Sequence, residues 1–168
     1  MRQVMNDALK NLIDSDKARN KENRRTKLYL NLLRREELMG GVKSKLISII
    51  RVLLFDKYCV EISSKSRIGG GLRLPHLHDI TVSEFAEIGS NCTIFHQVTI
   101  GVNECKSTKK APRIGDDVYI GVGAKLIGDI VVGNNCIIGA NAVVTKNIPD
   151  NMIVTEYNKM RGKYENRD

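Results

Sequence analysis

From Ile62 onward, aliphatic residues recur every six positions, which matches neither the period of a helix nor the alternation of a simple strand. They form three phased runs: Ile62, Ile68, Leu74, Ile80; after a slip of two residues, Val82, Ile88, Ile94, Ile100; and after a longer break, Ile114, Ile120, Leu126, Val132, Ile138, Val144. A small residue commonly occupies the fourth position after the aliphatic one, an alternation that a narrow three-sided coil packs without voids. The pattern therefore predicts a repetitive β-coil, and a sandwich of short strands is the weaker alternative.

The first 57 residues have helical patterning instead. Leu28, Leu32 and Leu33 repeat at three-to-four spacing, and Gly40-Gly41 separates them from an apolar segment at 42–55. We therefore expect a helical segment at 1–57, a coil at 58–154 with an extruded loop at 102–113, and a basic tail at 155–168.

The apolar helix at 42–55 needs a partner. Packing on the open end of the coil is the favoured expectation, because strand groups there would otherwise lack hydrogen bonds. Contact with a membrane surface is the alternative, since Lys43, Lys45 and Arg51 flank the apolar residues.

Composition narrows the function only partly. The net charge of +8, from 27 basic and 19 acidic residues, favours anionic partners such as a nucleotide cofactor, nucleic acid or anionic lipid. Only 5% of residues are aromatic and no RNA-binding motif occurs, so nucleic acid is not an expected partner. The four cysteines form no CxxC pair, which disfavours a zinc site or a disulfide scaffold. A polar start and the lack of a long apolar run predict a cytoplasmic protein.

The repeat (L/I/V)-G-x-x-small-x resembles that of the hexapeptide-repeat acyltransferases. Segments 61–76, 88–101 and 113–151 resemble the serine acetyltransferase branch in particular. The resemblance implies a mainly β fold, a left-handed parallel β-helix of hexapeptide repeats with a short N-terminal α-helical segment. It also implies acetyl-CoA as donor, no metal, and a homotrimer whose site is shared between subunits.

In the resembling branch, a histidine takes the proton of the acceptor hydroxyl and an acidic residue fifteen positions earlier orients it. The matching residues are His76 and Glu61. Fifteen residues is slightly less than the about eighteen of one three-sided coil, so the pair is expected on adjacent coils. A neutral imidazole is a suitable base near neutral pH. The alternative is that His76 is an ordinary surface histidine.

His96 holds the same repeat position as His76 once the two-residue slip is subtracted, so we expect the two imidazoles one coil apart. His96 then lines the acceptor pocket, handles a proton or makes a structural hydrogen bond. His78 falls at an inward position and is expected to be packed and hydrogen-bonded. A three-histidine metal site is disfavoured, because His78 would point away from the other two.

The resemblance also implies where the cofactor and acceptor bind. Coenzyme A is expected along the C-terminal coils, mostly against backbone, at Gly121, Val122, Gly123, Gly139 and Ala140, with Lys146 as a phosphate contact. The acceptor is expected to contact Pro75, His96 and Lys110. The loop at 102–113 carries Lys106, Lys109, Lys110 and Arg113, which either meet an anionic ligand or are simply solvated.

Departures from the branch affect the acceptor. Serine acetyltransferases have Asp before the catalytic His and an Arg-His pair in the loop, whereas this chain has Pro75 and Lys110-Ala111. Losing these charge partners should weaken binding of a free amino acid. We therefore predict an O-acetyltransferase that acts on a sugar or glycan hydroxyl in exopolysaccharide or capsule biosynthesis. The alternatives are a serine O-acetyltransferase of cysteine biosynthesis and a non-catalytic β-helix scaffold.

Overall fold

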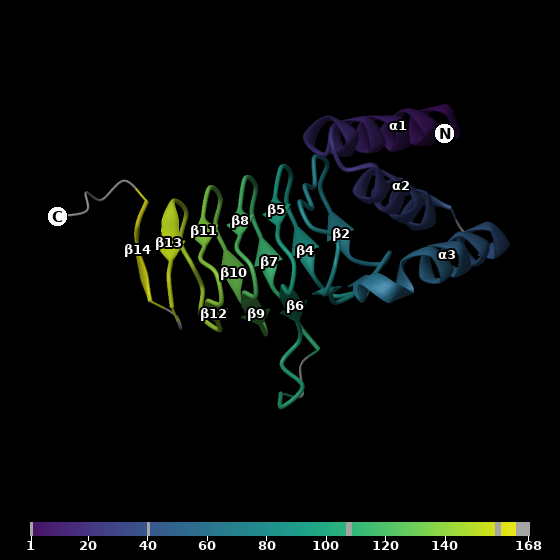
Figure 1. Cartoon of the computed structure of the whole chain (residues 1–168). Helices are drawn as coiled ribbons and strands as arrows, with labels where there is room; N and C mark the ends of the chain where they lie inside the picture. Colours follow the sequence, from purple (N-terminus) through teal and green to yellow (C-terminus); the bar gives the residue numbers. More distant parts are fainter. Residues whose placement is uncertain (1, 40, 107–108, 157–158, 164–168) are drawn as a thin grey trace.

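The computed structural model describes residues 2–39, 41–106, 109–156 and 159–163. Three helices gather at one end of a coil of short strands, and a loop projects from the coil after β6 (Figure 1). The helices are α1 (Arg2–Arg19), α2 (Arg24–Leu38) and α3 (Gly41–Phe55), followed by the short 3₁₀ helix η1 (Asp56–Tyr58). The expected helical segment and coil are therefore both present.

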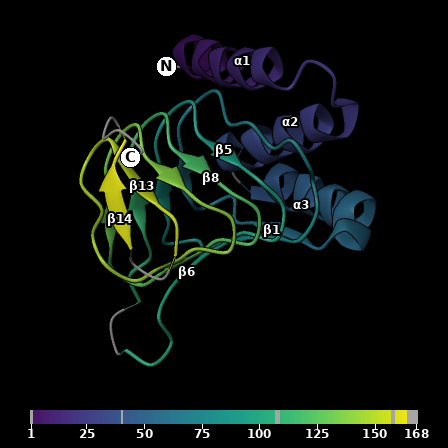
Figure 2. The ribbon, with the colours of Figure 1, turned by 60° about the vertical axis from the view of Figure 1, so that its left-hand side comes forward.

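The strands form three sheets, here called faces A, B and C. The middle turns of the coil contribute one short strand to each face, while the first turn reaches face C and the last turn reaches face B only as isolated bridges at Arg73 and Ile148. Figure 2 shows the successive turns stacked with the helices to one side. Face A holds β1 (Val60–Ile62), β3 (Ile80–Val82), β6 (Thr99–Gly101), β9 (Lys125–Ile127) and β12 (Val143–Val144). Face B holds β2 (Arg67–Ile68), β4 (Glu87–Ile88), β7 (Arg113–Ile114) and β10 (Val131–Val132). Face C holds β5 (Thr93–Ile94), β8 (Tyr119–Ile120), β11 (Ile137–Ile138), β13 (Met152–Val154) and β14 (Met160–Gly162).

The core follows the six-residue repeat. Every aliphatic position of the three runs is buried. The fourth position after each of them, which usually holds a small residue, is also buried within the runs, except where it holds His78. Neighbouring strands within the coil pair in parallel, so equivalent residues of successive turns stack into columns. The predicted parallel β-coil is confirmed.

The two-residue slip lies in a corner rather than in a strand. Val60 pairs with Ile80, twenty positions on, whereas Thr81 pairs with Thr99, eighteen positions on. Ile80 and Val82 both lie in β3 and both are buried. The extra residues therefore lengthen the turn between faces C and A, at residues 75–79, and this turn carries His76 and His78.

The N-terminal end of the coil is capped by the hairpin of α1 and α2 through polar side chains. Asp16 Oδ1 accepts a hydrogen bond from Leu72 N at 2.8 Å. The Asn20 side chain donates to Leu72 O at 2.8 Å and accepts from Leu74 N at 3.1 Å. Thr26 Oγ1 donates to Leu74 O at 3.0 Å. These bonds satisfy strand groups that would otherwise be unpaired at the first turn.

Arg34 of α2 completes the cap. Its guanidinium is fully buried, pairs with Asp16 at 2.8 Å, and donates to Ile68 O and Gly69 O, each at 2.7 Å. α3 also contacts this end, because Arg51 donates to Ile62 O at 3.0 Å and Phe55 is buried against the coil. Most of the hydrogen-bonding side chains, however, come from α1 and α2.

The apolar face of α3 instead points to solvent. Val42, Leu46, Ile49 and Leu53 are 83%, 58%, 55% and 77% exposed, at the spacing of one helix face. Arg51 points inward, where it donates to Glu36 Oε2 at 2.9 Å and to the Tyr29 hydroxyl at 2.8 Å, so it does not flank the exposed stripe as expected. Among the described residues, no helix is long and apolar enough to cross a membrane.

At the C-terminal end, β14 pairs with β13 in the antiparallel sense. Part of the segment expected as a basic tail is therefore a strand of face C. Residues 157–158 and 164–168 of that segment lie outside the described residues.

Candidate active site

The turns between faces C and A, here called the C–A corner, stack into a continuous column joined by backbone hydrogen bonds. Asp79 N donates to Tyr58 O at 2.8 Å, Gln97 N to His78 O at 3.4 Å, Gly123 N to His96 O at 3.0 Å, and Asn141 N to Val122 O at 2.7 Å. His78, His96, Val122 and Ala140 therefore occupy equivalent places in successive turns. The residue equivalent to His96 in the first turn is His78, and His76 belongs to the inserted part of the corner.

A left-handed backbone residue closes each of these turns. Cys59, Asp79, Gln97, Gly123 and Asn141 all have φ between 52° and 73°. Glycine is required at position 123, because a Cβ there would lie 2.1 Å from Asn141 Oδ1. The corner backbone is thus fixed by conformation as well as by hydrogen bonds.

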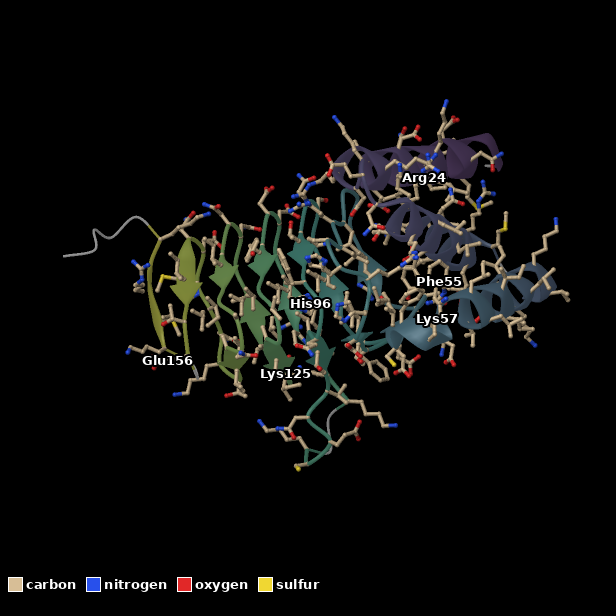
Figure 3. The ribbon with its side chains drawn as sticks, in the orientation of Figure 1. Arg24, Phe55, Lys57, His96, Lys125 and Glu156 are labelled. Carbon is tan, nitrogen blue, oxygen red and sulfur yellow. The ribbon has the colours of Figure 1, made fainter. Side chains whose placement is uncertain are left out.

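Three imidazoles meet at the N-terminal part of the C–A corner. The ring centroids of His78 and His96 are 4.5 Å apart, and those of His76 and His96 are 5.2 Å apart at an interplanar angle of 89°. Figure 3 shows His96 on the coil, with Phe55 where α3 meets it. The expected proximity of His76 and His96 is confirmed, although the residue in register with His96 is His78.

His78 does not point inward as expected. It is half-exposed, and its Nδ1 lies 2.9 Å from Asp79 Oδ2. The lengthened corner turns the side chain out of the core, so it does not point away from His76 and His96. The sequence analysis did not predict this imidazole–carboxylate pair. The adjacency of His78 and Asp79 in the sequence could have indicated it. Within the described part of the chain, no group of three or more potential ligands is arranged to hold a metal ion.

His96 is the half-buried member of the cluster. Its Nδ1 is inaccessible to water and has no hydrogen-bond partner among the described residues. Removal from water lowers the pKa of His96, the nearby imidazoles of His78 and His76 lower it further, and Asp79 opposes them. The His96 imidazole is therefore neutral at physiological pH.

Glu61 and His76 line different hollows on the two sides of this corner. Glu61 lies on a shallow groove along face A with Thr81, Thr99 and Lys125, whose register stacks them in one row. His76 is exposed and lines a separate pocket together with Pro75. The Glu61–His76 dyad stays a prediction, because the carboxylate found beside an imidazole is that of Asp79.

The residues predicted for coenzyme A divide between two corners. Gly121, Val122, Gly123, Gly139 and Ala140 all lie on the C–A corner, in the two turns after His96. Lys146 is exposed in the turn between faces A and B, here called the A–B corner, after β12. The five positions predicted to contact coenzyme A through their backbone thus lie in the same corner as His78 and His96, whereas Lys146 lies in a different corner.

The loop at 102–113 also leaves from the A–B corner and extends away from the coil (Figure 1). Lys110 Nζ lies 3.0 Å from Asp129 Oδ2, and Arg113 lies 3.7 Å from the other oxygen of Asp129. The hydrogen bond from Lys110 lowers the pKa of Asp129. This pair is exposed and contributes little stability, so binding of the acceptor by Lys110 stays a prediction. Residues 107 and 108 lie outside the described residues.

Comparison with known proteins identifies the type of chain. Residues 111–146 match the family model described as bacterial transferase hexapeptide (six repeats). The serine acetyltransferase of Mycobacterium tuberculosis is 40% identical over 95 residues, 56% of this chain and 42% of that protein. That of Helicobacter pylori is 41% identical over 90 residues, 54% of this chain and 53% of that protein. The chain thus spans about half the length of the curated relatives it matches.

Solved structures agree with these matches. The soybean serine acetyltransferase apoenzyme superimposes with a TM-score of 0.79 at 27% identity, over 91% of this chain and 68% of that chain. The serine acetyltransferase of Neisseria gonorrhoeae in complex with serine gives 0.72 at 25% identity, over 93% and 68%. Residues 111–146 are thus similar to the hexapeptide-repeat transferases, and the fold of the whole coil is similar to that of these solved structures. Among such proteins, the chain is similar to the serine acetyltransferases.

These relatives overturn the prediction of a sugar acceptor in exopolysaccharide or capsule biosynthesis. The curated relatives named above are serine acetyltransferases, and one of the solved structures is a complex with serine. The prediction gave too much weight to Pro75 and Lys110-Ala111, which are three side chains in a match that runs along the coil.

Proposed function

We propose that the protein transfers the acetyl group of acetyl-CoA to the hydroxyl of L-serine, and that His76 is the general base. The observation that carries this proposal is the C–A corner itself. One column holds His76 beside a pocket, then His96, then the backbone predicted to contact coenzyme A. The serine acetyltransferases among its relatives support the choice of acceptor.

In the proposed reaction His76 accepts the proton of the serine hydroxyl while the hydroxyl oxygen bonds to the thioester carbon. The carbon–sulfur bond then breaks, and the imidazolium returns the proton to the sulfur of coenzyme A. His96 stays neutral, so it offers an acceptor or a donor near His76 without adding a positive charge that would oppose formation of the imidazolium.

We further propose a homotrimer of left-handed coils. The left-handed sense is supported by the hexapeptide match and by the likeness to the soybean structure. The trimer is supported by the division of the predicted residues, because Lys110 and Lys146 lie on the A–B corner whereas His76 and His96 lie on the C–A corner. Face A separates these corners in one chain, and the A–B corner of a neighbouring copy can complete the site.

His76→Ala tests the reaction. Release of the coenzyme A thiol with L-serine as acceptor should fall by at least about 10²-fold, the usual contribution of a general base. Thermal unfolding should be unchanged, because His76 is exposed. Val131→Ala, at an exposed position on face B and outside both corners of the proposed site, is the control and should keep full activity. Wild-type turnover in His76→Ala would contradict the assigned base.

A further inference from the structure

The pocket beside His76 contains no acidic side chain. Its volume is about 230 Å³, the scale of a small acceptor rather than of a polymer. It is lined by Asn23, Arg25, Tyr58, Pro75, His76, Leu77 and His78. The Arg25 guanidinium and the His76 imidazole, with no carboxylate among the lining residues, favour an anionic group on the ligand, whereas His78 is already paired with Asp79 beside the pocket.

Arg25 has no anionic partner in the described part of the chain. Its side chain is exposed, and its guanidinium carbon lies 5.6 Å from the centre of the Tyr58 ring, which Lys57 also approaches at 5.2 Å. By contrast, Arg34 and Arg51 of the same helical region each pair with a carboxylate. Arg25 therefore has its charge available to a ligand, while the aromatic ring restricts where the guanidinium lies.

The backbone that carries Arg25 is fixed to the segment that carries His76. Asn23 Nδ2 donates to Pro75 O at 3.3 Å, and Asn23 Oδ1 accepts from Thr26 N at 3.0 Å. Thr26 Oγ1 donates to Leu74 O at 3.0 Å. Arg25 lies between these two anchoring residues, so its position relative to His76 is set by bonds on both sides.

We propose that Arg25 binds the carboxylate of the amino-acid acceptor, which directs the acceptor hydroxyl toward His76. This inference rests on the proposed function. A planar guanidinium matches a carboxylate with two parallel hydrogen bonds, which a lysine does not reproduce. The cation that sequence resemblance assigned to the acceptor, Lys110, pairs with Asp129 at the other corner of the chain. Arg25, which belongs to α2 of the helical cap, thus places a positive charge in the pocket next to His76.

Steady-state kinetics of Arg25→Met and Arg25→Lys test this assignment, with L-serine and ethanolamine as alternative acceptors. Ethanolamine keeps the hydroxyl and the amine but lacks the carboxylate. KM for L-serine should rise roughly 10-fold or more in Arg25→Met, as expected for loss of a charge-assisted pair, with kcat nearly unchanged. Arg25→Lys should lie between Arg25→Met and the wild type. KM for ethanolamine should not change in either variant. Arg24→Met, which removes the neighbouring exposed arginine, is the matched control and should behave as wild type.

The outcomes separate the two proposals. No thiol release by the wild-type protein with L-serine overturns the proposed function and this inference with it. Activity in the wild type with equal KM values in Arg25→Met and Arg24→Met overturns the role of Arg25 alone. An equal loss with L-serine and ethanolamine also overturns it, because a general distortion of the pocket does not discriminate between acceptors.

Discussion

At the residue scale, the protonation of the histidine cluster depends on one carboxylate and three imidazoles. Asp79 contacts His78, His78 lies against His96, and His96 meets His76 edge to face. The two neighbouring imidazoles and the loss of hydration lower the pKa of His96, and Asp79 opposes them. His96 therefore senses a charge on His76 or His78.

Asp79→Asn should lower the pKa of His96 further. The pKa of His96 already lies below the ordinary value of about 6.5, and the variant removes the negative charge that raises it. NMR titration of the imidazole protons measures this change, with Asp14→Asn in α1 as a control that leaves the titration unchanged. A pKa for His96 at or above that of an exposed histidine would contradict the arrangement.

The sequence could predict which aliphatic residues are buried but not which way His78 points. A six-residue period records only inward positions, and Ile80 and Val82 are both inward. The period is therefore compatible with two extra residues either before or after Ile80. If they came after Ile80, His76 would be in register with His96; because they come before it, His78 is. Only the strand pairing distinguishes them.

At the scale of elements, α1 and α2 stabilise the first turn of the coil through side chains rather than through an apolar interface alone. Arg34 is the fully buried member of these contacts, and it joins Asp16 to the carbonyl oxygens of Ile68 and Gly69. Asp16 is itself buried, so its charge depends on the guanidinium. The cap and the first turn should therefore unfold together.

Arg34→Met should lower the free energy of unfolding by about 3–5 kcal/mol, the usual result when one member of a buried ion pair is removed. Two strand carbonyl groups also lose their donors. Chemical denaturation measures the change. Arg35→Met is the matched control, since Arg35 is exposed and bonds only to Asn31 one turn away, and it should change stability by less than about 0.5 kcal/mol. Equal effects of the two substitutions would contradict the role of Arg34.

Helix patterning predicted the three helices but could not predict which side chains cap the coil. Asp16, Asn20, Thr26 and Arg34 look in sequence like the solvated face of a helix, whereas α3 looks like the apolar partner. The first turn needs hydrogen bonds more than apolar surface, so polar side chains are buried there. The apolar face of α3 remains on the surface.

At the scale of the whole molecule, the predicted site residues occupy two corners that one chain cannot bring together. Resemblance to a family gave these residues as a set of predicted positions on the coil, yet no single-chain pattern indicates which corners meet. That depends on the arrangement of subunits. The structure of one chain therefore contains the C–A half and the A–B half of the proposed site on separate edges.

Sedimentation velocity should give the mass of three chains at micromolar concentration, because each proposed site takes one corner from each of two neighbours. Arg67→Ala, an exposed change on face B outside the two corners that are proposed to meet, is a control that should leave the mass unaltered. A species with the mass of one chain across the concentration range would contradict the shared site.

The two ends of the coil have a consequence for polymerisation. A parallel coil presents at each end a row of strand groups that matches the row at its opposite end, so molecules placed end to end would extend into a filament. Here the first turn has its groups bound mainly by side chains of α1 and α2, and on face C the last turn is followed by β14, which runs in the opposite direction. Both features disfavour extension of the coil by another copy in the parallel sense and favour association through the sides of the coil, where closed rings form.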